Sequence, residues 1–159
     1  MERPELKKDL AEADLFRGLT EKDLVLFTKL GTIKRFKKGD HLVAEDQQGH
    51  DVFIILAGRA DIEITLPDSG RAQVIATIKK GEILGDLMLL DYVRRSASAR
   101  AKDDVTTITW TKEELLELFE KNTRIGYVVM RNLAKIIARR LTATNMELRN
   151  VMNKMIEFA

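Results

Sequence analysis

Glycine recurs at short, even intervals through the middle of the chain, in KKGD, QQGHD, LAGRA, DSGRA and KKGE. These glycines stand 9 to 12 residues apart, and the runs between them are rich in β-branched and other apolar residues. Turn residues at this spacing are typical of small β sandwiches and barrels, because each strand has to reverse after a few residues. We therefore expect residues 32–110 to form an antiparallel β jelly roll.

The order of the strands is the next expectation. The segment 51–82 contains β-rich runs broken at Gly58, at PDSG and at KKG, which predicts an antiparallel meander. Further on, ASARAKDDVTTITW predicts a last pair of strands around a turn at residues 102–104. Both predictions assume that neighbours in the sequence pair in the same sheet.

Helical patterns precede the β region. In residues 1–31, apolar residues recur at helical spacing, Gly18 interrupts them, and Thr20 is followed three residues later by Asp23. A threonine cap with an acid in the first turn marks the start of a helix. We expect two short helices there.

Helical patterns also follow the β region. Thr111 and Glu114 have the spacing of a capping box, so residues 111–159 are predicted to be helical, with a break near Asn122 and Thr123. Helices, then strands, then helices make an α+β arrangement. A chain of 159 residues has the size of one domain, so residues 1–159 are expected to form a single domain.

The last helix carries an apolar seam with alternating steps of three and four residues, the spacing of a heptad repeat. Its members are Met130, Ala134, Ile137, Leu141, Thr144, Leu148, Val151 and Met155. One interpretation is a helix that packs on its own domain through a wide stripe that also includes Leu133, Ile136, Met152 and Ile156. We favour self-association, because a helix about forty ångströms long exceeds what a sandwich of this size can cover. The seam predicts a homodimer through the C-terminal helix.

Composition argues against several classes of protein. Twenty-seven Lys and Arg residues against twenty-five Asp and Glu residues give a net charge of +2, too balanced for a dedicated nucleic-acid binder. The chain has no cysteine, which excludes disulfides and thiolate metal sites. No segment approaches the roughly eighteen apolar residues of a membrane span, and MERPELKKDL carries charge where a signal peptide has its apolar core. We expect a cytoplasmic protein without a membrane partner.

The segment GEILGDLMLLDYVRRSASARA, residues 81–101, contains the parts of a phosphate site. An anion at a β domain needs backbone N–H groups, a glycine where the chain approaches closely, and an arginine whose planar fork matches two oxygens. Gly85, Arg95 and Ser96 supply these parts, and residues 86–91 are long enough for one or two helical turns. The sequence thus predicts a ligand cradle.

Each part also has a purely structural interpretation. Gly81 and Gly85 can simply end strands, and Asp86 can be the N-cap of a short helix. Arg94 and Arg95 can be an exposed pair of charges. The combination within one segment favours the cradle.

At these residues the chain resembles the cyclic nucleotide-binding domain family, which includes the bacterial catabolite activator protein, the regulatory subunits of cyclic AMP-dependent kinase and cyclic nucleotide-gated channels. The resemblance runs from LFRGLT to the last helix. FKKGDHLVAEDQQGHDVFIILAGRADI resembles the family's glycine-punctuated strands, and residues 81–101 resemble its phosphate-binding cassette. Cupins share the jelly roll, but the sequence lacks the histidine cluster of their metal site, since His41 and His50 are its only histidines.

The resemblance implies roles for the cassette residues. Arg95 binds the cyclic phosphate, Ser96 and the adjacent backbone N–H groups add phosphate contacts, and Gly85 allows the backbone to approach closely. Leu87 and Ala97 complete the ligand-binding residues predicted in the cassette.

Asp86 departs from the family, whose usual residue here is a glutamate that accepts a hydrogen bond from the ribose 2′-hydroxyl. Aspartate keeps the charge but is one methylene shorter. Either the sugar moves inward, a water bridges the gap, or the bond is lost at a cost of about 1–3 kcal/mol. Met88 and residues 91–93 also stand where the family commonly has small residues, which would narrow the pocket.

By the same resemblance, the base lies against Leu56, Ile75 and Leu84, and the last helix closes over it. Thr144 and Asn145 would then meet the edge of the base. The alternative for Thr144 is a polar seam residue that sets the register of paired helices.

Taken with the resemblance, the sequence predicts a regulatory module that binds a 3′,5′-cyclic nucleotide, cyclic AMP in preference to cyclic GMP, and signals through its C-terminal helix. One alternative is a degenerate module that keeps the fold for dimerisation without a nucleotide. Another is the sensor part of a truncated transcription regulator. In the activator relatives a DNA-binding helix-turn-helix follows the long helix, whereas this sequence ends at NKMIEFA. We expect no enzyme, since no nucleophile–base pair stands out, and neither a metal nor a cofactor.

Overall fold

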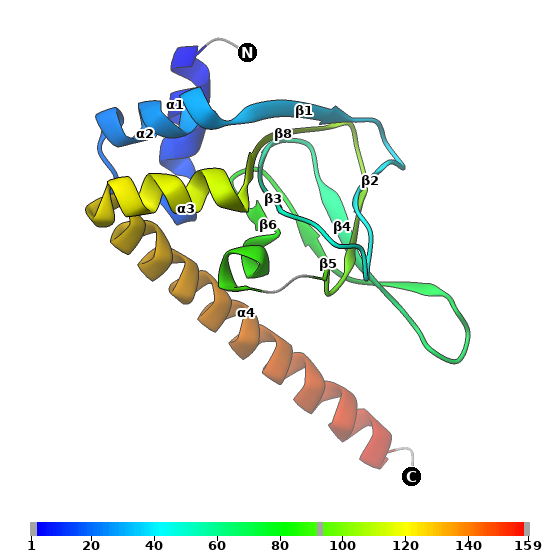
Figure 1. Ribbon diagram of the computed structural model, residues 1–159. Helices are drawn as coiled ribbons and strands as arrows, with labels where there is room; N and C mark the ends of the chain where they lie inside the picture. The colour runs from blue at the N-terminus through cyan, green and yellow to red at the C-terminus, as the bar shows by residue number, and fades with distance from the viewer. Residues whose placement is uncertain (1–2, 92–93, 158–159) are drawn as a thin grey trace.

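The computed structural model describes residues 3–91 and 94–157, in which helices flank a body of strands (Figure 1). The N-terminal helices are α1 (Arg3–Glu12), the 3₁₀ helix η1 (Asp14–Phe16) and α2 (Glu21–Leu30). The strands are β1 (Thr32–Phe36), β2 (His41–Val43), β3 (Asp51–Ala57), β4 (Ala60–Thr65), β5 (Ala72–Ile78), β6 (Ile83–Leu84), β7 (Ser98–Ala101) and β8 (Val105–Thr111). The 3₁₀ helix η2 (Asp86–Leu90) lies between β6 and β7, and α3 (Lys112–Lys121) and α4 (Thr123–Glu157) follow β8.

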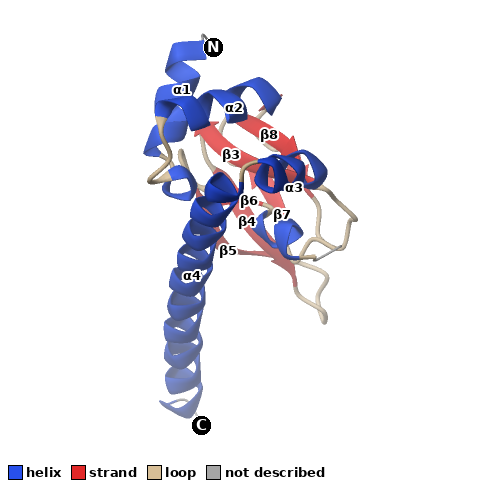
Figure 2. Ribbon diagram, turned by 60° about the vertical axis from the view of Figure 1, so that its left-hand side comes forward, coloured by secondary structure: helices blue, strands red, loops and turns tan. Residues whose placement is uncertain are grey.

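The described strands form two antiparallel sheets of four strands each. The first sheet has the order β1-β8-β3-β6, and the second has the order β2-β7-β4-β5. Most strands that are neighbours in the sequence therefore lie in opposite sheets, as in a jelly roll. This arrangement confirms the predicted α+β fold with flanking helices (Figure 2).

Two pairings expected from the sequence are wrong. Residues 51–82 do not form a meander, because β3 belongs to the first sheet while β4 and β5 pair in the second. The strands β7 and β8 do turn at residues 102–104, but they enter different sheets. At the turn between β3 and β4, Gly58 has a φ of +78°, and a side chain there would collide with the Asp104 carbonyl. Turn residues locate the ends of strands, but they do not determine which sheet the next strand joins.

The strand β3 is buried on both faces because it separates two hydrophobic clusters. Val52, Ile54 and Leu56 belong to the helix-side cluster, between the first sheet and the helices. Phe53 and Ile55 belong to the interior cluster, between the two sheets. Successive side chains of a strand point to opposite faces, so position along β3 decides which cluster a residue joins.

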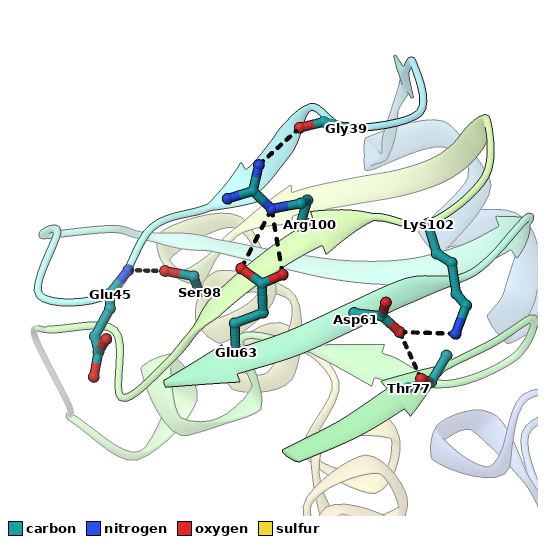
Figure 3. Close-up of polar contacts among 8 residues, drawn as sticks. All are labelled: Gly39, Glu45, Asp61, Glu63, Thr77, Ser98, Arg100 and Lys102. Atoms are coloured by element: carbon teal, nitrogen blue, oxygen red, sulfur yellow. Dashed lines mark hydrogen bonds and ion pairs between the residues drawn. The ribbon is translucent and has the colours of Figure 1, made fainter. Parts of the chain in front are cut away.

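The outer face of the second sheet is polar, as Figure 3 shows. Arg100 Nε on β7 donates to Glu63 on β4 at 3.3 Å. Asp61 accepts a hydrogen bond from Thr77 Oγ1 at 2.6 Å and pairs with Lys102 at 3.5 Å. Ile62, between the two acids, packs against the interior cluster instead. The apolar face of this sheet is therefore the inner one.

The predicted threonine cap at Thr20 and the predicted capping box at Thr111 are both present, and Thr20 also forms a full capping box. Thr20 and Asp23 exchange side-chain and backbone hydrogen bonds at the start of α2, and Thr111 and Glu114 do the same at the start of α3. The helical region also breaks where expected, since α3 ends at Lys121 and α4 begins two residues later. Among the described residues, none of these helices is long and apolar enough to cross a bilayer.

The helix α4 has two halves with opposite surroundings. In its first half Ile125, Val129 and Leu133 are buried in the helix-side cluster. Its second half, residues 141–157, runs past the sandwich and is exposed throughout (Figure 1). The apolar side chains left exposed there include Leu141, Leu148, Val151 and Met155, each more than half exposed. Packing on the domain, the alternative interpretation of the seam, thus holds for the first half of the helix alone.

Candidate functional site

The segment between β6 and β7 forms a turn followed by a short helix. Gly85 has a left-handed conformation with a φ of +81° and is the N-cap residue of η2. The helix η2 confirms the one or two helical turns predicted for residues 86–91. Asp86 is its first residue rather than its N-cap, and no side chain makes a capping bond there. Residues 92–93, part of the predicted bulky segment, lie outside the described residues.

Arg95 is the centre of the candidate site. Its side chain is only 6% exposed, its Nη2 donates to the Asp51 carbonyl at 2.8 Å, and its Cζ lies 5.9 Å from the centre of the Phe53 ring. Its Nη1 is buried without a hydrogen-bond partner among the described residues. Burial lowers the pKa of the guanidinium, since desolvation disfavours the charged form, while the Asp51 charge acts in the opposite direction. The site therefore holds a desolvated cation with unused donors, the chemistry that binds an anion.

Two glycines bring the backbone against this guanidinium. A Cβ atom on Gly49 would lie 2.6 Å from both Nε and Nη2 of Arg95. A Cβ atom on Gly85 would lie 2.5 Å from Nη1 and 2.6 Å from the Asp51 carbonyl. Sequence reasoning singled out Gly85 for a close approach of the backbone to a ligand, which stays a prediction, and it missed Gly49, although the glycine in QQGHD was a visible signal. Both glycines keep side chains away from the tip of Arg95.

The neighbours of Arg95 alternate in exposure. Arg94 and Ser96 are exposed, whereas Arg95 is buried and Ala97 is half-buried. Backbone hydrogen bonds fix this segment, because Arg95 N–H donates to the Gln47 carbonyl and its carbonyl accepts from Asp46 N–H, both at 3.0 Å. The two adjacent arginines therefore differ in surroundings.

Asp86 is buried, and it pairs with an arginine that sequence reasoning missed. Arg140 Nη1 donates to Asp86 Oδ2 at 2.8 Å, and Arg140 Nη2 donates to the Ile83 carbonyl at 2.7 Å. This arginine lies one helical turn before Thr144, at the end of the packed half of α4. The only sequence signal was a pair of charges within the apolar stripe. The cassette and the last helix are thus joined by two hydrogen bonds from one side chain.

The residues predicted to contact the base are not brought together. Leu84 packs against the interior cluster, and Ile75 is 46% exposed on β5. Leu56 needs correction: it belongs to the helix-side cluster, so it lies on the other face of the first sheet from Leu84. Thr144 and Asn145 are exposed, and Thr144 Oγ1 donates to the Arg140 carbonyl within its own helix at 3.0 Å.

Met88 and Leu87 also lie on the helix side. Met88 is buried in the helix-side cluster, and Leu87 is half-buried against it. The expectation that Met88 narrows the pocket is therefore wrong, because its side chain fills the core beneath η2. His41 and His50 are exposed, and the described residues contain no cluster of three His, Cys, Asp or Glu residues that could hold a metal ion.

Known proteins share this fold. Residues 33–122 match the family described as cyclic nucleotide-binding domain. The cyclic AMP receptor protein of Thermus thermophilus is 28% identical over 134 residues, which are 84% of this chain and 60% of that protein. Glutaminase 1 of Bradyrhizobium diazoefficiens is 28% identical over 86% of this chain and 21% of its own length. A solved cyclic nucleotide-binding domain from Methylobacillus flagellatus has a TM-score of 0.80 at 20% identity, covering 91% of this chain and 80% of that one.

The region that matches the family extends from β1 to the end of α3 and covers more than half of the chain. It contains Arg95 with the two glycines at its tip, as well as Asp86. This chain spans three fifths of the Thermus protein and about a fifth of the glutaminase. Because the family match covers more than half of the chain, the chain belongs to the cyclic nucleotide-binding domain family.

Proposed function

We propose that this chain is a regulatory module that binds a 3′,5′-cyclic nucleotide in residues 81–101 and signals through α4. The observation that carries the proposal is the Arg95 guanidinium, buried between Gly49 and Gly85 with no acceptor for Nη1 among the described residues. A buried donor without a partner costs about 1–3 kcal/mol. A cyclic phosphate supplies anionic oxygens of the kind that a guanidinium binds best.

Each part of the cassette has a role in this proposal. Arg95 binds the phosphate, and Ser96 and Ala97, the next two residues of the segment, contact it as well. Gly85 has no side chain that would displace Nη1 of Arg95. Asp86 accepts a hydrogen bond from the sugar 2′-hydroxyl through Oδ1, since Oδ2 is held by Arg140.

The pair of Asp86 and Arg140 supports a route for the signal. A ligand that hydrogen-bonds Asp86 changes the charge environment of Arg140, which lies on α4. Ligand binding and the position of α4 are then linked, because Arg140 takes one position when Asp86 is hydrogen-bonded to the ligand and another when it is not. The base lies against Leu84, which packs against the interior cluster, while Ile75 stays a predicted contact because it is exposed on β5.

The exposed half of α4 supports a homodimer. Leu141, Leu148, Val151 and Met155 form a strip of apolar surface along one helix, and a partner helix would remove it from water. Light scattering at micromolar concentration should give the mass of two chains, and Leu148→Asp should give one. A monomeric wild type would contradict this part of the proposal.

One observation favours a second candidate, a module that dimerises without a nucleotide. The Asp86 carboxylate, which would accept a hydrogen bond from the sugar 2′-hydroxyl, is already paired with Arg140. Titration calorimetry of the wild type with cyclic AMP and cyclic GMP separates the two candidates. We expect binding, tighter for cyclic AMP, in line with the name of the Thermus relative. A folded protein that gives neither heat nor a melting shift at millimolar ligand would favour the second candidate. A non-catalytic role and a cytoplasmic location stay predictions.

A further inference from the structure

Two cations lie near one aromatic ring of the interior cluster, that of Phe53. Lys34 Nζ, from β1, is 5.6 Å from the centre of the Phe53 ring, and Arg95 Cζ is 5.9 Å from the same point. Asp51 stands two residues before Phe53 on β3, so its side chain points to the same face of the sheet. A lysine, an acid and the phosphate-binding arginine are therefore neighbours.

Asp51 contacts the two cations through different groups. Its carboxylate Oδ2 accepts from Lys34 Nζ at 2.9 Å, whereas its backbone carbonyl accepts from Arg95 Nη2 at 2.8 Å. Burial lowers the pKa of the guanidinium, and the Asp51 charge is near enough to oppose that shift. The carboxylate thus acts on Arg95 without being hydrogen-bonded to it.

Loss of Lys34 would free the Asp51 carboxylate from its hydrogen-bonded cation. The Asp51 carboxylate would then have Arg95 as its neighbouring cation, with Nη1 lacking an acceptor among the described residues. A carboxylate matches a guanidinium as well as a phosphate does. An internal acid paired with Arg95 would compete with any anionic ligand.

We propose that Lys34 is a positioning residue for the phosphate site: by holding the Asp51 carboxylate, it leaves Nη1 of Arg95 without an internal acceptor, so that the phosphate of the ligand can bind it. This role rests on the proposed function. It acts through Asp51, so it depends on that acid being present.

The test is a double-mutant cycle measured by titration calorimetry with cyclic AMP, and with cyclic GMP in parallel. Lys34→Met should weaken binding about tenfold, because only molecules in which Arg95 is free of Asp51 can bind. Asp51→Asn in the same chain should restore the affinity to within about threefold of the wild type, because the competing acid is gone and the carbonyl remains. A merely structural role of Lys34 predicts no recovery.

Two further variants serve as controls. Lys37→Met removes an equal charge from an exposed pair with Asp104, and it should change affinity by less than about twofold. Lys34→Arg keeps the cation and should bind the nucleotide like the wild type. Thermal melts of each variant report whether it is folded.

Failure of this inference is distinguishable from failure of the proposed function. If Lys34→Met binds like the wild type while Arg95→Ala loses binding, the positioning role falls and the proposed function stands. If the double variant stays as weak as Lys34→Met, or Lys37→Met loses as much, the role also falls. A folded wild type that binds neither nucleotide overturns both.

Discussion

The phosphate end and the base end of the candidate site are built differently. At the phosphate end, Arg95 is buried, hydrogen-bonded to the Asp51 carbonyl and bordered by two glycines. At the predicted base end, Ile75 on β5 and both Thr144 and Asn145 on α4 are exposed. One end is formed by the fold of the domain itself, while the other depends on where α4 lies.

Physical chemistry accounts for this difference. A phosphate leaves water only if fixed donors replace its hydration, so its site benefits from being formed before binding. A base needs mainly an apolar surface against it, and a mobile element such as a helix can supply that surface when the ligand binds. A helix that is packed in one half and exposed in the other is suited to such movement.

The largest expected effect tests the phosphate end. Arg95→Ala removes a buried charge from its anionic partner, which costs about 2–5 kcal/mol, so affinity for cyclic AMP should fall about thirty- to several-thousand-fold. Arg94→Ala is the matched control and should change affinity by less than about threefold, since Arg94 is exposed. Titration calorimetry measures both, and equal losses would show that the wrong arginine has been assigned to the phosphate.

Gly85→Ala should have the next largest effect. A methyl group there would displace Nη1 of Arg95 and the Asp51 carbonyl, and loss of a hydrogen bond to the charged phosphate should lower affinity about tenfold. Gly39→Ala is the control, because Gly39 has a similar φ, +91°, with nothing within 4 Å of a Cβ atom. Both variants should lower the melting temperature, since each strains the backbone. Equal affinities would mean that Gly85 serves the turn alone.

Arg140→Ala tests the boundary between the two ends. Without its partner the Asp86 carboxylate loses its orientation, so affinity for cyclic AMP should fall about fivefold. The affinity for 2′-deoxy cyclic AMP should change much less, because this analogue lacks the hydroxyl that would donate a hydrogen bond to Asp86. Arg139→Ala is the control, since Arg139 pairs with Asp14 at 2.7 Å on the exposed side of the helix. Tighter binding in Arg140→Ala would mean that Arg140 competes with the sugar.

The main residues of the phosphate end could be singled out from sequence because they are local, and their binding of a phosphate stays a prediction. Gly85, Asp86 and Arg95 stand within one segment, and their combination is specific. Gly49 and Lys34 could not be identified, since a turn glycine and a strand lysine give no signal of the side chain that they meet across the fold.

The base end was harder to predict for a different reason. The strand β3 is apolar on both faces, so alternation does not show that Leu56 faces the helices while Phe53 faces the site. Arg140 was missed because a charged residue on a helix ordinarily points to solvent. Only the tertiary position of α4 brings it to Asp86.

The smallest expected effect is at the base end itself. Thr144→Ala and Asn145→Ala remove exposed groups, and Thr144 already donates to its own helix. Exposed substitutions usually stay within about 0.5 kcal/mol, so affinity for cyclic AMP should change by about a factor of two or less. A loss above about tenfold would mean that α4 closes over the base when the ligand binds, which would remove the difference between the two ends.

Repeating the measurement in Leu148→Asp then shows which of the two helices makes the contact. A loss that persists in the monomer belongs to the chain's own helix, whereas one that disappears belongs to the partner's helix.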